Sequence, residues 1–156
     1  MVRVFPVLHV LSAVIAIFGL TLLLPLALSH FLDDGASFAY DEAILITFAS
    51  GAALWGMTRE HKGELQTRDG FLLVSLVWTV LPAFATIPLI VAIPGLSFTD
   101  AYFETVSGLT TTGATVLTGL DHLPASLNLW RTQLVWMGGM GVVVLAVAIL
   151  PLLGVG

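Results

Sequence analysis

The chain has 156 residues, of which 58% are hydrophobic and only 10% are charged, and its formal net charge is −5. Globular domains carry about 25% charged residues, so this composition excludes an ordinary soluble domain and indicates an all-α integral membrane protein. The acidic balance argues against nucleic acid as a partner, and the absence of cysteine excludes disulfides and thiolate chemistry.

Two apolar blocks predict a pair of transmembrane helices within residues 1–60. The first block covers residues 4–28 and is interrupted by Pro25. A signal peptide is the alternative, because Arg3 precedes the apolar run. However, the run exceeds the usual signal-peptide core of about 7–15 residues, and no clear cleavage site follows it. We therefore expect a membrane helix here.

The second block, residues 43–57, is short for a membrane span of about 20 residues. We expect its helix to extend to Tyr40 and Asp41 at one end and to Thr58 at the other. Tyr40 and Trp55 are expected to act as anchors at the two membrane interfaces, where amphipathic aromatic rings are enriched.

The third and fourth blocks predict two further transmembrane helices, over residues 70–93 and 126–151. Pro82 and Pro88 lie inside the third block. Prolines are tolerated in membrane helices when neighbouring groups satisfy the freed carbonyls, so one kinked helix is expected there. Residues 94–126, between the two blocks, are less apolar and rich in threonine and glycine.

The distribution of basic residues predicts the orientation of the helices. Cytoplasmic loops carry an excess of lysine and arginine, and both termini are cytoplasmic if the basic residues before the first block and between the second and third blocks lie inside. That arrangement places four of the five basic residues in the cytoplasm: Arg3, Arg59, Lys62 and Arg68. Residues 94–126 then lie on the outer side, where acidic residues would concentrate cations.

A short helix is predicted over residues 97–108. Ser97 with Asp100 three residues later is a capping-box start signal, and Gly108 is a natural C-terminal stop. Such a helix covers only about 15 Å at 1.5 Å per residue, so it cannot cross a bilayer. We expect it to enter and return on the same side, which requires burial in protein or a water-filled cavity.

The stretch SGLTTTGAT, residues 107–115, follows this helix directly. Carbonyls outside a helix and threonine hydroxyls supply oxygen ligands, and Gly113 can adopt backbone conformations that strain other residues. These groups suit a dehydrated cation and not an anion. Compared with the potassium-channel filter TVGYG, Thr111 takes the first position and Gly113 the third. A plain polar loop between two membrane helices is the alternative.

The stretches YFETVSGLTTTGATVLTGLDHLP and LWRTQLVWMGGMGVVVLAVAILPLLGVG resemble the Trk/Ktr/HKT superfamily of potassium transporters, and most closely its TrkH-type uptake subunits. That resemblance implies an N-terminal helix pair followed by four pore repeats. Residues 61–156 would form the first repeat, and its four parts would be a helix at 70–93, a pore helix at 97–108, a filter at 110–115 and a helix at 126–151.

The resemblance also implies the site and the partners. Backbone carbonyls of Thr110, Thr111, Thr112 and Gly113 would coordinate potassium, which is cargo, and no cofactor is implied. The family works in the bacterial inner membrane as a homodimer with a cytosolic, nucleotide-binding ring of regulatory subunits. Because a family pore needs four repeats and this chain has one, it looks like a fragment; self-assembly of a short form is the alternative.

Three further features carry hypotheses. Glu104, in the short helix, is expected to support the filter loop, with Arg131 as its partner, although it could instead set the field at the pore mouth. Arg131 could alternatively be an interfacial residue whose charge reaches water. The GGMG run, residues 138–141, is expected to allow close helix packing, with a gating hinge as the alternative.

Two functions compete with potassium conduction at this stage. A membrane enzyme could use Glu104, Asp121 and His122 as acid–base groups, but no nucleophile or metal motif accompanies them. A non-conducting assembly or regulatory segment is the other alternative. The sequence does not define the preference for potassium over sodium, the coupling ion or the gating mechanism.

Overall fold

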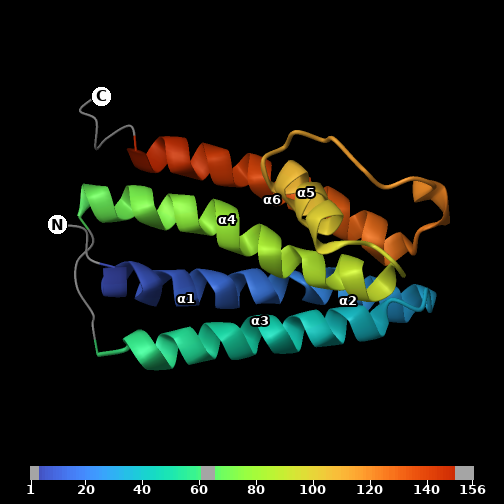
Figure 1. The fold of residues 1–156 in the computed structure, drawn as a ribbon, viewed down its shortest axis with the longest axis horizontal. Coiled ribbons are helices and arrows are strands. Elements are labelled where there is room, and N and C mark those ends of the chain that lie inside the picture. Colours follow the sequence, from blue (N-terminus) through green and yellow to red (C-terminus); the bar gives the residue numbers. More distant parts are fainter. Residues whose placement is uncertain (1–3, 61–65, 150–156) are drawn as a thin grey trace.

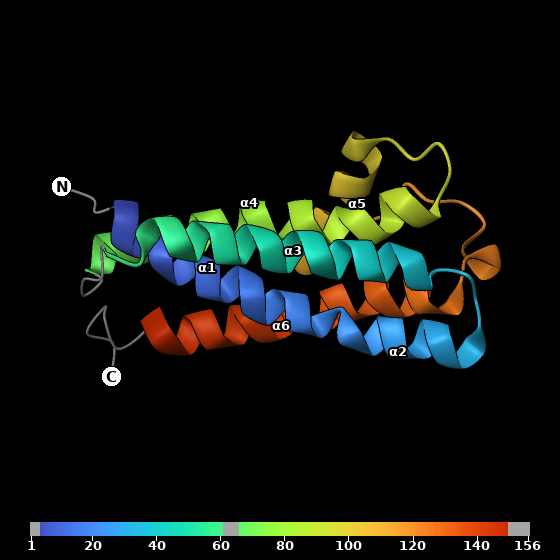
Figure 2. The same cartoon turned by 90° about the horizontal axis from the view of Figure 1, so that it is seen from below.

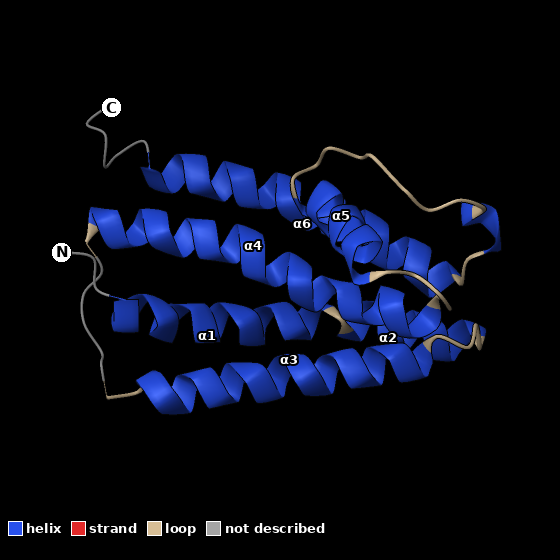
Figure 3. Ribbon diagram, viewed as in Figure 1, coloured by secondary structure: helices blue, strands red, loops and turns tan. Residues whose placement is uncertain are grey.

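The computed structural model describes residues 4–60 and 66–149, which form six α-helices and one short 3₁₀ helix. No strand occurs in these two ranges (Figure 3). The helices α1, α3, α4 and α6 run side by side along the long axis of the molecule (Figures 1 and 2). The all-α class is therefore confirmed.

The first apolar block forms two helices, α1 (Val4–Thr21) and α2 (Leu23–Leu32). The block thus extends beyond the predicted residues 4–28, and it breaks at Leu22. Pro25 explains the break, because a proline has no N–H for the carbonyl four residues earlier, which is that of Thr21. The side-chain amide of Gln133, on α6, donates to this carbonyl at 2.8 Å. The last residue of α1 is therefore hydrogen-bonded to α6 at the break.

The second block lies within α3 (Ser37–Thr58), whose 22 residues span about 33 Å at 1.5 Å per residue. The predicted extension to Tyr40 and Asp41 at one end and to Thr58 at the other is confirmed. The anchoring role of Tyr40 is wrong, because its side chain is fully buried in protein contacts. Trp55 is half-exposed, as an interfacial side chain requires.

The third block is a single helix, α4 (Thr67–Ala92), that contains both prolines. Each proline weakens the backbone hydrogen bonds of the preceding turn, and in both turns the carbonyl three residues before the proline accepts a bond from another helix. The hydroxyl of Tyr102 donates to Thr79 at 3.0 Å, and the indole N–H of Trp130 donates to Ala85 at 3.1 Å. The prolines thus become docking points for the helices that follow.

The helix α5 (Phe98–Leu109) lies across the long axis of the bundle, and the chain then returns to the end at which η1 (Leu120–His122) and α6 (Ala125–Ile149) begin (Figures 1 and 2). This path matches the predicted re-entrant segment. The last helix agrees with the predicted residues 126–151 as far as residue 149. The predicted end at Pro151 lies outside the described residues.

The surface of the bundle is apolar. Two helical stretches, Val4–Leu32 and Arg68–Ala92, are long and apolar enough to cross a membrane by length and composition. Large apolar side chains point outward from several helices, including Phe31, Phe38, Met57 and Trp136. Exposed apolar area of this extent marks a surface that contacts another apolar phase. Arg3 and Lys62, on which the predicted orientation partly depends, lie outside the described residues.

Candidate functional site: the end of α5 and the loop that follows

The start of α5 is fixed by its cap. The hydroxyl of Ser97 accepts a hydrogen bond from the N–H of Asp100 at 3.1 Å and donates to the carboxylate of Asp100 at 2.8 Å. An N-cap hydroxyl satisfies one of the free N–H groups of a first helical turn. The predicted start signal is therefore present, with Ser97 as the cap and Phe98 as the first helical residue.

The end of α5 differs from the prediction. Gly108 was expected to stop the helix, but the helix continues to Leu109. Gly108 instead allows close packing, because a Cβ added there would lie 3.1 Å from the Cβ of Leu134 on α6. That distance is shorter than an ordinary van der Waals contact, so the absence of a side chain at Gly108 brings α5 against α6.

A threonine takes the left-handed position that ends the helix. Thr111 has φ 59°, its N–H donates to the carbonyl of Gly108, and the N–H of Thr112 donates to that of Ser107, both at 2.9 Å. This is the Schellman arrangement, which normally uses glycine. A β-branched residue in this conformation is an outlier, and such strain costs about 1–3 kcal/mol. The backbone of Thr111 is therefore held in place by its surroundings.

Four consecutive N–H groups, those of residues 110–113, donate to carbonyls in the last turn of α5, and these belong to Val106, Gly108 and Ser107. In a trans peptide the C=O of one residue points opposite to the N–H of the next. The carbonyls of residues 110, 111 and 112 therefore point away from the helix. In the described ranges they accept no hydrogen bond, and their residues are exposed.

Gly113 completes this segment. Its φ is 74°, and an added Cβ would meet no atom within 4 Å. The position therefore needs glycine for its backbone conformation and not for space. The hydroxyls of Thr110 and Thr112 are less free than the carbonyls, because that of Thr110 donates to Val106 at 2.8 Å and lies 2.8 Å from that of Thr112. The main oxygen ligands on offer are peptide carbonyls.

Glu104 and Arg131 meet behind this segment. The carboxylate of Glu104, only 4% exposed, accepts from Nε of Arg131 at 2.7 Å and also from its Nη2. The same carboxylate accepts from the hydroxyl of Thr115 at 2.9 Å and from the N–H of Val116 at 3.1 Å. The ion pair thus ties α5, α6 and the loop after Gly113 together.

The end of α5 reaches far along α6. A Cβ added to Gly138 would lie 2.0 Å from the carbonyl oxygen of Leu109, so the two backbones touch. Gly138 lies about 20 Å from the start of α6, at 1.5 Å per residue. The predicted close packing by the glycine run is confirmed at this residue.

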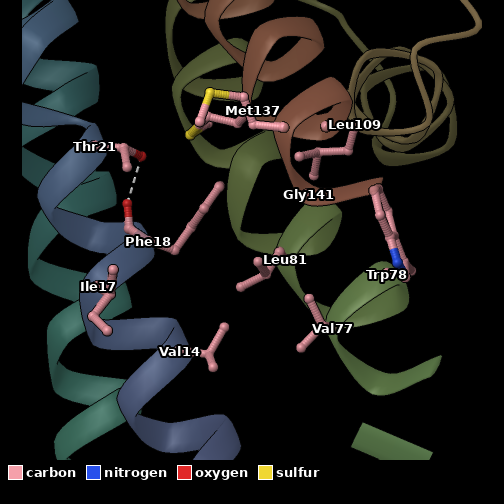
Figure 4. Close-up of a pocket in the computed structure, with 12 residues that line it drawn as sticks. Val14, Ile17, Phe18, Thr21, Val77, Trp78, Leu81, Leu109, Met137 and Gly141 are labelled. Carbon is pink, nitrogen blue, oxygen red and sulfur yellow. Dashed lines mark hydrogen bonds between the residues drawn. The ribbon is translucent and has the colours of Figure 1, made fainter. Parts of the chain in front are cut away.

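Two cavities flank the end of α5. A small, partly polar one of about 110 Å³ lies between α5, α6 and the loop. A larger one of about 480 Å³ lies between α1, α4, α6 and the end of α5, where Leu109 and Met137 face Phe18, Leu81 and Trp78 (Figure 4). The larger cavity is lined by apolar side chains and Thr21, whose hydroxyl donates to the carbonyl of Phe18, so it is a poor site for a cation.

The structure brings Thr110, Thr111, Thr112 and Gly113 together on one exposed segment, and it places Glu104 and Arg131 behind them. Their role in binding potassium stays a prediction. Asp121 and His122 lie in the exposed helix η1, and no hydrogen bond joins them to Glu104 in the described part of the chain.

Sequence reasoning missed two residues that hold the loop, Ser107 and Thr115. A signal for Ser107 exists in the chain. Glu104, Ser107 and Gly108 fall on one face of α5 at spacings of three and four, and all three are buried. The short helix is expected to be buried, and one of its faces carries only polar and small residues. Such a face indicates contact with the backbone of a neighbouring segment.

The sequence model of the TrkH family, a family of cation transport proteins, matches residues 36–156. The chain is 47% identical over 149 residues to the Trk system potassium uptake protein TrkH of Salmonella typhimurium, which covers 95% of this chain and 31% of that protein. It is 38% identical over 149 residues to TrkG of Escherichia coli, with the same two coverages.

The crystal structure of the potassium transporter TrkH from Vibrio parahaemolyticus has the same fold, with a TM-score of 0.90 and 44% sequence identity. The match covers 99% of this chain and 33% of that chain. The chain thus spans 31% of the length of the curated relatives named above. The family match extends over most of the sequence, and the predicted resemblance to this family is confirmed: the chain belongs to the TrkH family of cation transport proteins.

Proposed function

We propose that the chain carries one filter segment of a membrane pore for potassium uptake. The observation that supports this most directly is the set of bare carbonyls at residues 110–112, next to Gly113. Carbonyl oxygens replace the hydration shell of potassium in known filters. The relatives named as potassium uptake proteins support the choice of ion.

The mechanism is selective passage, so no bond is made or broken. The negative end of the α5 dipole points toward the segment, and the carbonyls face outward, where further filter segments would complete the coordination. The segment of residues 110–113 supplies one side of such a site. Binding must stay weak enough for the ion to leave. Exposed, uncharged carbonyl oxygens meet this condition better than charged carboxylates would.

The finer parts of the proposal follow from the resemblance. The pore would lie in the bacterial inner membrane with residues 94–126 on the outer side. Its partners would be lipid, the remaining pore repeats, a second copy of the protein and a cytosolic, nucleotide-binding ring of regulatory subunits. Potassium is cargo, and the proposal includes no cofactor and no enzymatic step.

A substitution at Gly113 tests the proposal. Gly113→Asp in the full-length protein adds a side chain and a charge beside the carbonyls of residues 111 and 112. We expect potassium uptake to be lost in cells that depend on this transporter, with the amount of protein in the membrane unchanged.

Gly35→Asp is the matched control. Gly35 has φ 79°, and a Cβ added there also meets nothing within 4 Å, so it carries the same backbone strain far from the filter segment. It should leave uptake unchanged. Normal uptake by the Gly113 variant, or equal losses in both variants, would contradict the proposal and favour a non-conducting assembly segment.

A further inference from the structure

Ser107 occupies a special position in the last turn of α5. It is 5% exposed, and both of its polar groups reach across to the loop. Its carbonyl accepts from the N–H of Thr112 at 2.9 Å and from that of Gly113 at 3.4 Å. Its hydroxyl donates to the carbonyl of Ala114 at 2.7 Å.

These three bonds enclose the segment from both sides. The carbonyl of Ser107 fixes the N–H groups of residues 112 and 113, and its hydroxyl turns the carbonyl of Ala114 inward. The carbonyls of residues 110–112 are thereby left pointing outward. The bond to Ala114 uses a side chain, so a substitution can remove it without touching the backbone bonds.

Other contacts act further along the loop. The pair of Glu104 and Arg131 holds Thr115 and Val116, which lie beyond Ala114. In the described part of the chain, no other side chain donates to the carbonyl of Ala114. The cavity of about 110 Å³ lies beside this bond, lined by Ser107, Gly113 and Ala114 among others. The loop therefore has room to move into the cavity at this point.

We propose that the Ser107 hydroxyl is a positioning group that sets the spacing of the filter carbonyls and so determines how well the site discriminates potassium from sodium. The inference rests on the proposed function. Loss of the bond frees Ala114 to move into the cavity, and Gly113 moves with it. A site of looser spacing adapts to the smaller sodium ion, whereas the carbonyls themselves remain available to potassium.

The test compares variants of the full-length protein in liposomes, with potassium and sodium fluxes measured separately. Ser107→Ala should lower the potassium-to-sodium flux ratio roughly three- to tenfold, the equilibrium weight of one hydrogen bond. Ser107→Thr keeps the hydroxyl and should restore much of the ratio. If the alanine variant does not fold, Ser107→Cys should lower the ratio in its place, because the slightly larger thiol fills the site but is only a weak donor.

Thr132→Ala is the matched control. Thr132 lines the same cavity, but its hydroxyl donates to Asn128 and Leu129 of its own helix. Its flux ratio should equal that of the parent. An unchanged ratio in Ser107→Ala, or equal changes in both variants, would overturn the inference. A parent protein that carries no potassium would instead overturn the proposed function.

Discussion

The N-terminal helices α1–α3 and the proposed pore unit, α4–α6, differ in the contacts that hold each of them together. Between α1 and α3 the backbones approach closely at small residues. A Cβ added to Gly51 would lie 3.3 Å from the carbonyl oxygen of Ser12, and one on Gly19 would lie 3.2 Å from the ring of Phe48. In the pore unit, side chains of α5 and α6 reach backbone carbonyls and the loop.

The difference has a physical cause. Lipid is as apolar as a leucine side chain, so helices in membranes associate through close packing or through hydrogen bonds. In the described residues, the helix pair α1 and α3 is interrupted only by the break near Pro25, at the end of α1, and close packing predominates, with one side-chain contact between His9 and Thr58 at 3.3 Å. The pore unit contains two prolines, and the carbonyls freed in the turns before them need partners at membrane depth. Polar contacts are therefore concentrated there.

Gly138 is the place where the pore unit also depends on close packing, and we expect the largest effect there. In Gly138→Ala the new Cβ would lie 2.0 Å from the carbonyl oxygen of Leu109, so α5 and α6 must move apart. Overpacking typically costs about 1–3 kcal/mol and occasionally more. Here the clash is with backbone atoms that cannot rotate away, so the cost should exceed that range by more than the gain of about 1 kcal/mol in helix propensity. Thermal unfolding in detergent and potassium uptake should both show a loss.

Gly139→Ala is the control for this prediction. Its nearest atom, Cγ2 of Thr111, would lie at 3.8 Å, an ordinary contact. The variant should keep or gain up to about 1 kcal/mol of stability through helix propensity. If the two variants unfolded at the same temperature, the backbone contact between α5 and α6 would not limit the fold.

Arg131 tests the polar contacts of the pore unit, and its effect should come next in size. Arg131→Gln leaves the carboxylate of Glu104 buried without its cation, and removing one partner of a buried pair costs about 3–5 kcal/mol. Thr115 and Val116 still donate to that carboxylate, so we expect the lower end of this range. The melting temperature in detergent measures it.

The double variant Glu104→Gln with Arg131→Gln separates the pair from its surroundings. It removes both charges, so its loss of stability should be smaller than that of Arg131→Gln alone. A double variant less stable than the single one would show that the charge of Glu104 is favourable without Arg131. The hydrogen bonds from Thr115 and Val116 to Glu104, and not the ion pair, would then account for the stability of this part of the molecule.

The sequence predicts most of the helical pattern because apolar blocks and prolines are local signals. The predicted short helix at 97–108 is one residue from the observed one, and Ser97 caps it as expected. The predicted end of that helix at Gly108 is wrong, because the left-handed position is taken by Thr111 and not by a glycine. Propensity does not predict a strained threonine, since the surrounding hydrogen bonds impose that conformation.

Tyr40 and Ser107 show a second limit of the sequence. An aromatic residue near a helix end predicts an interfacial anchor, but Tyr40 is buried by contacts with other elements. Ser107 has no local motif, and its bond to Ala114 follows from the way the chain returns after α5. The candidate carbonyls could be predicted from the TTTG run, whereas the groups that orient them required the tertiary structure.

Asp34 joins the two regions, and we expect the smallest effect there. Its carboxylate, in the turn between α2 and α3, accepts from the N–H of Ser126 at 2.8 Å, in the first turn of α6, and from that of Ala36 at 3.2 Å. Burial would raise the pKa of Asp34, but hydrogen bonds from Ser29, Ser126 and Ala36 outweigh it and hold the pKa below the ordinary value of 3.8. Asp34→Asn should cost about 1 kcal/mol near neutral pH.

The sign of the pH dependence follows from the lowered pKa. The charged form is favoured in the folded state, so its contribution is complete above the unfolded pKa of about 3.9 and is lost as the pH falls through the folded value. The parent should therefore melt at a higher temperature than Asp34→Asn at pH 7, and the difference should shrink below pH 4. Asp121→Asn, in the exposed helix η1, should show no such difference at either pH. A difference for Asp34→Asn that persists unchanged at pH 3 would mean that packing, and not the charge at the start of α6, connects the N-terminal helices to the pore unit.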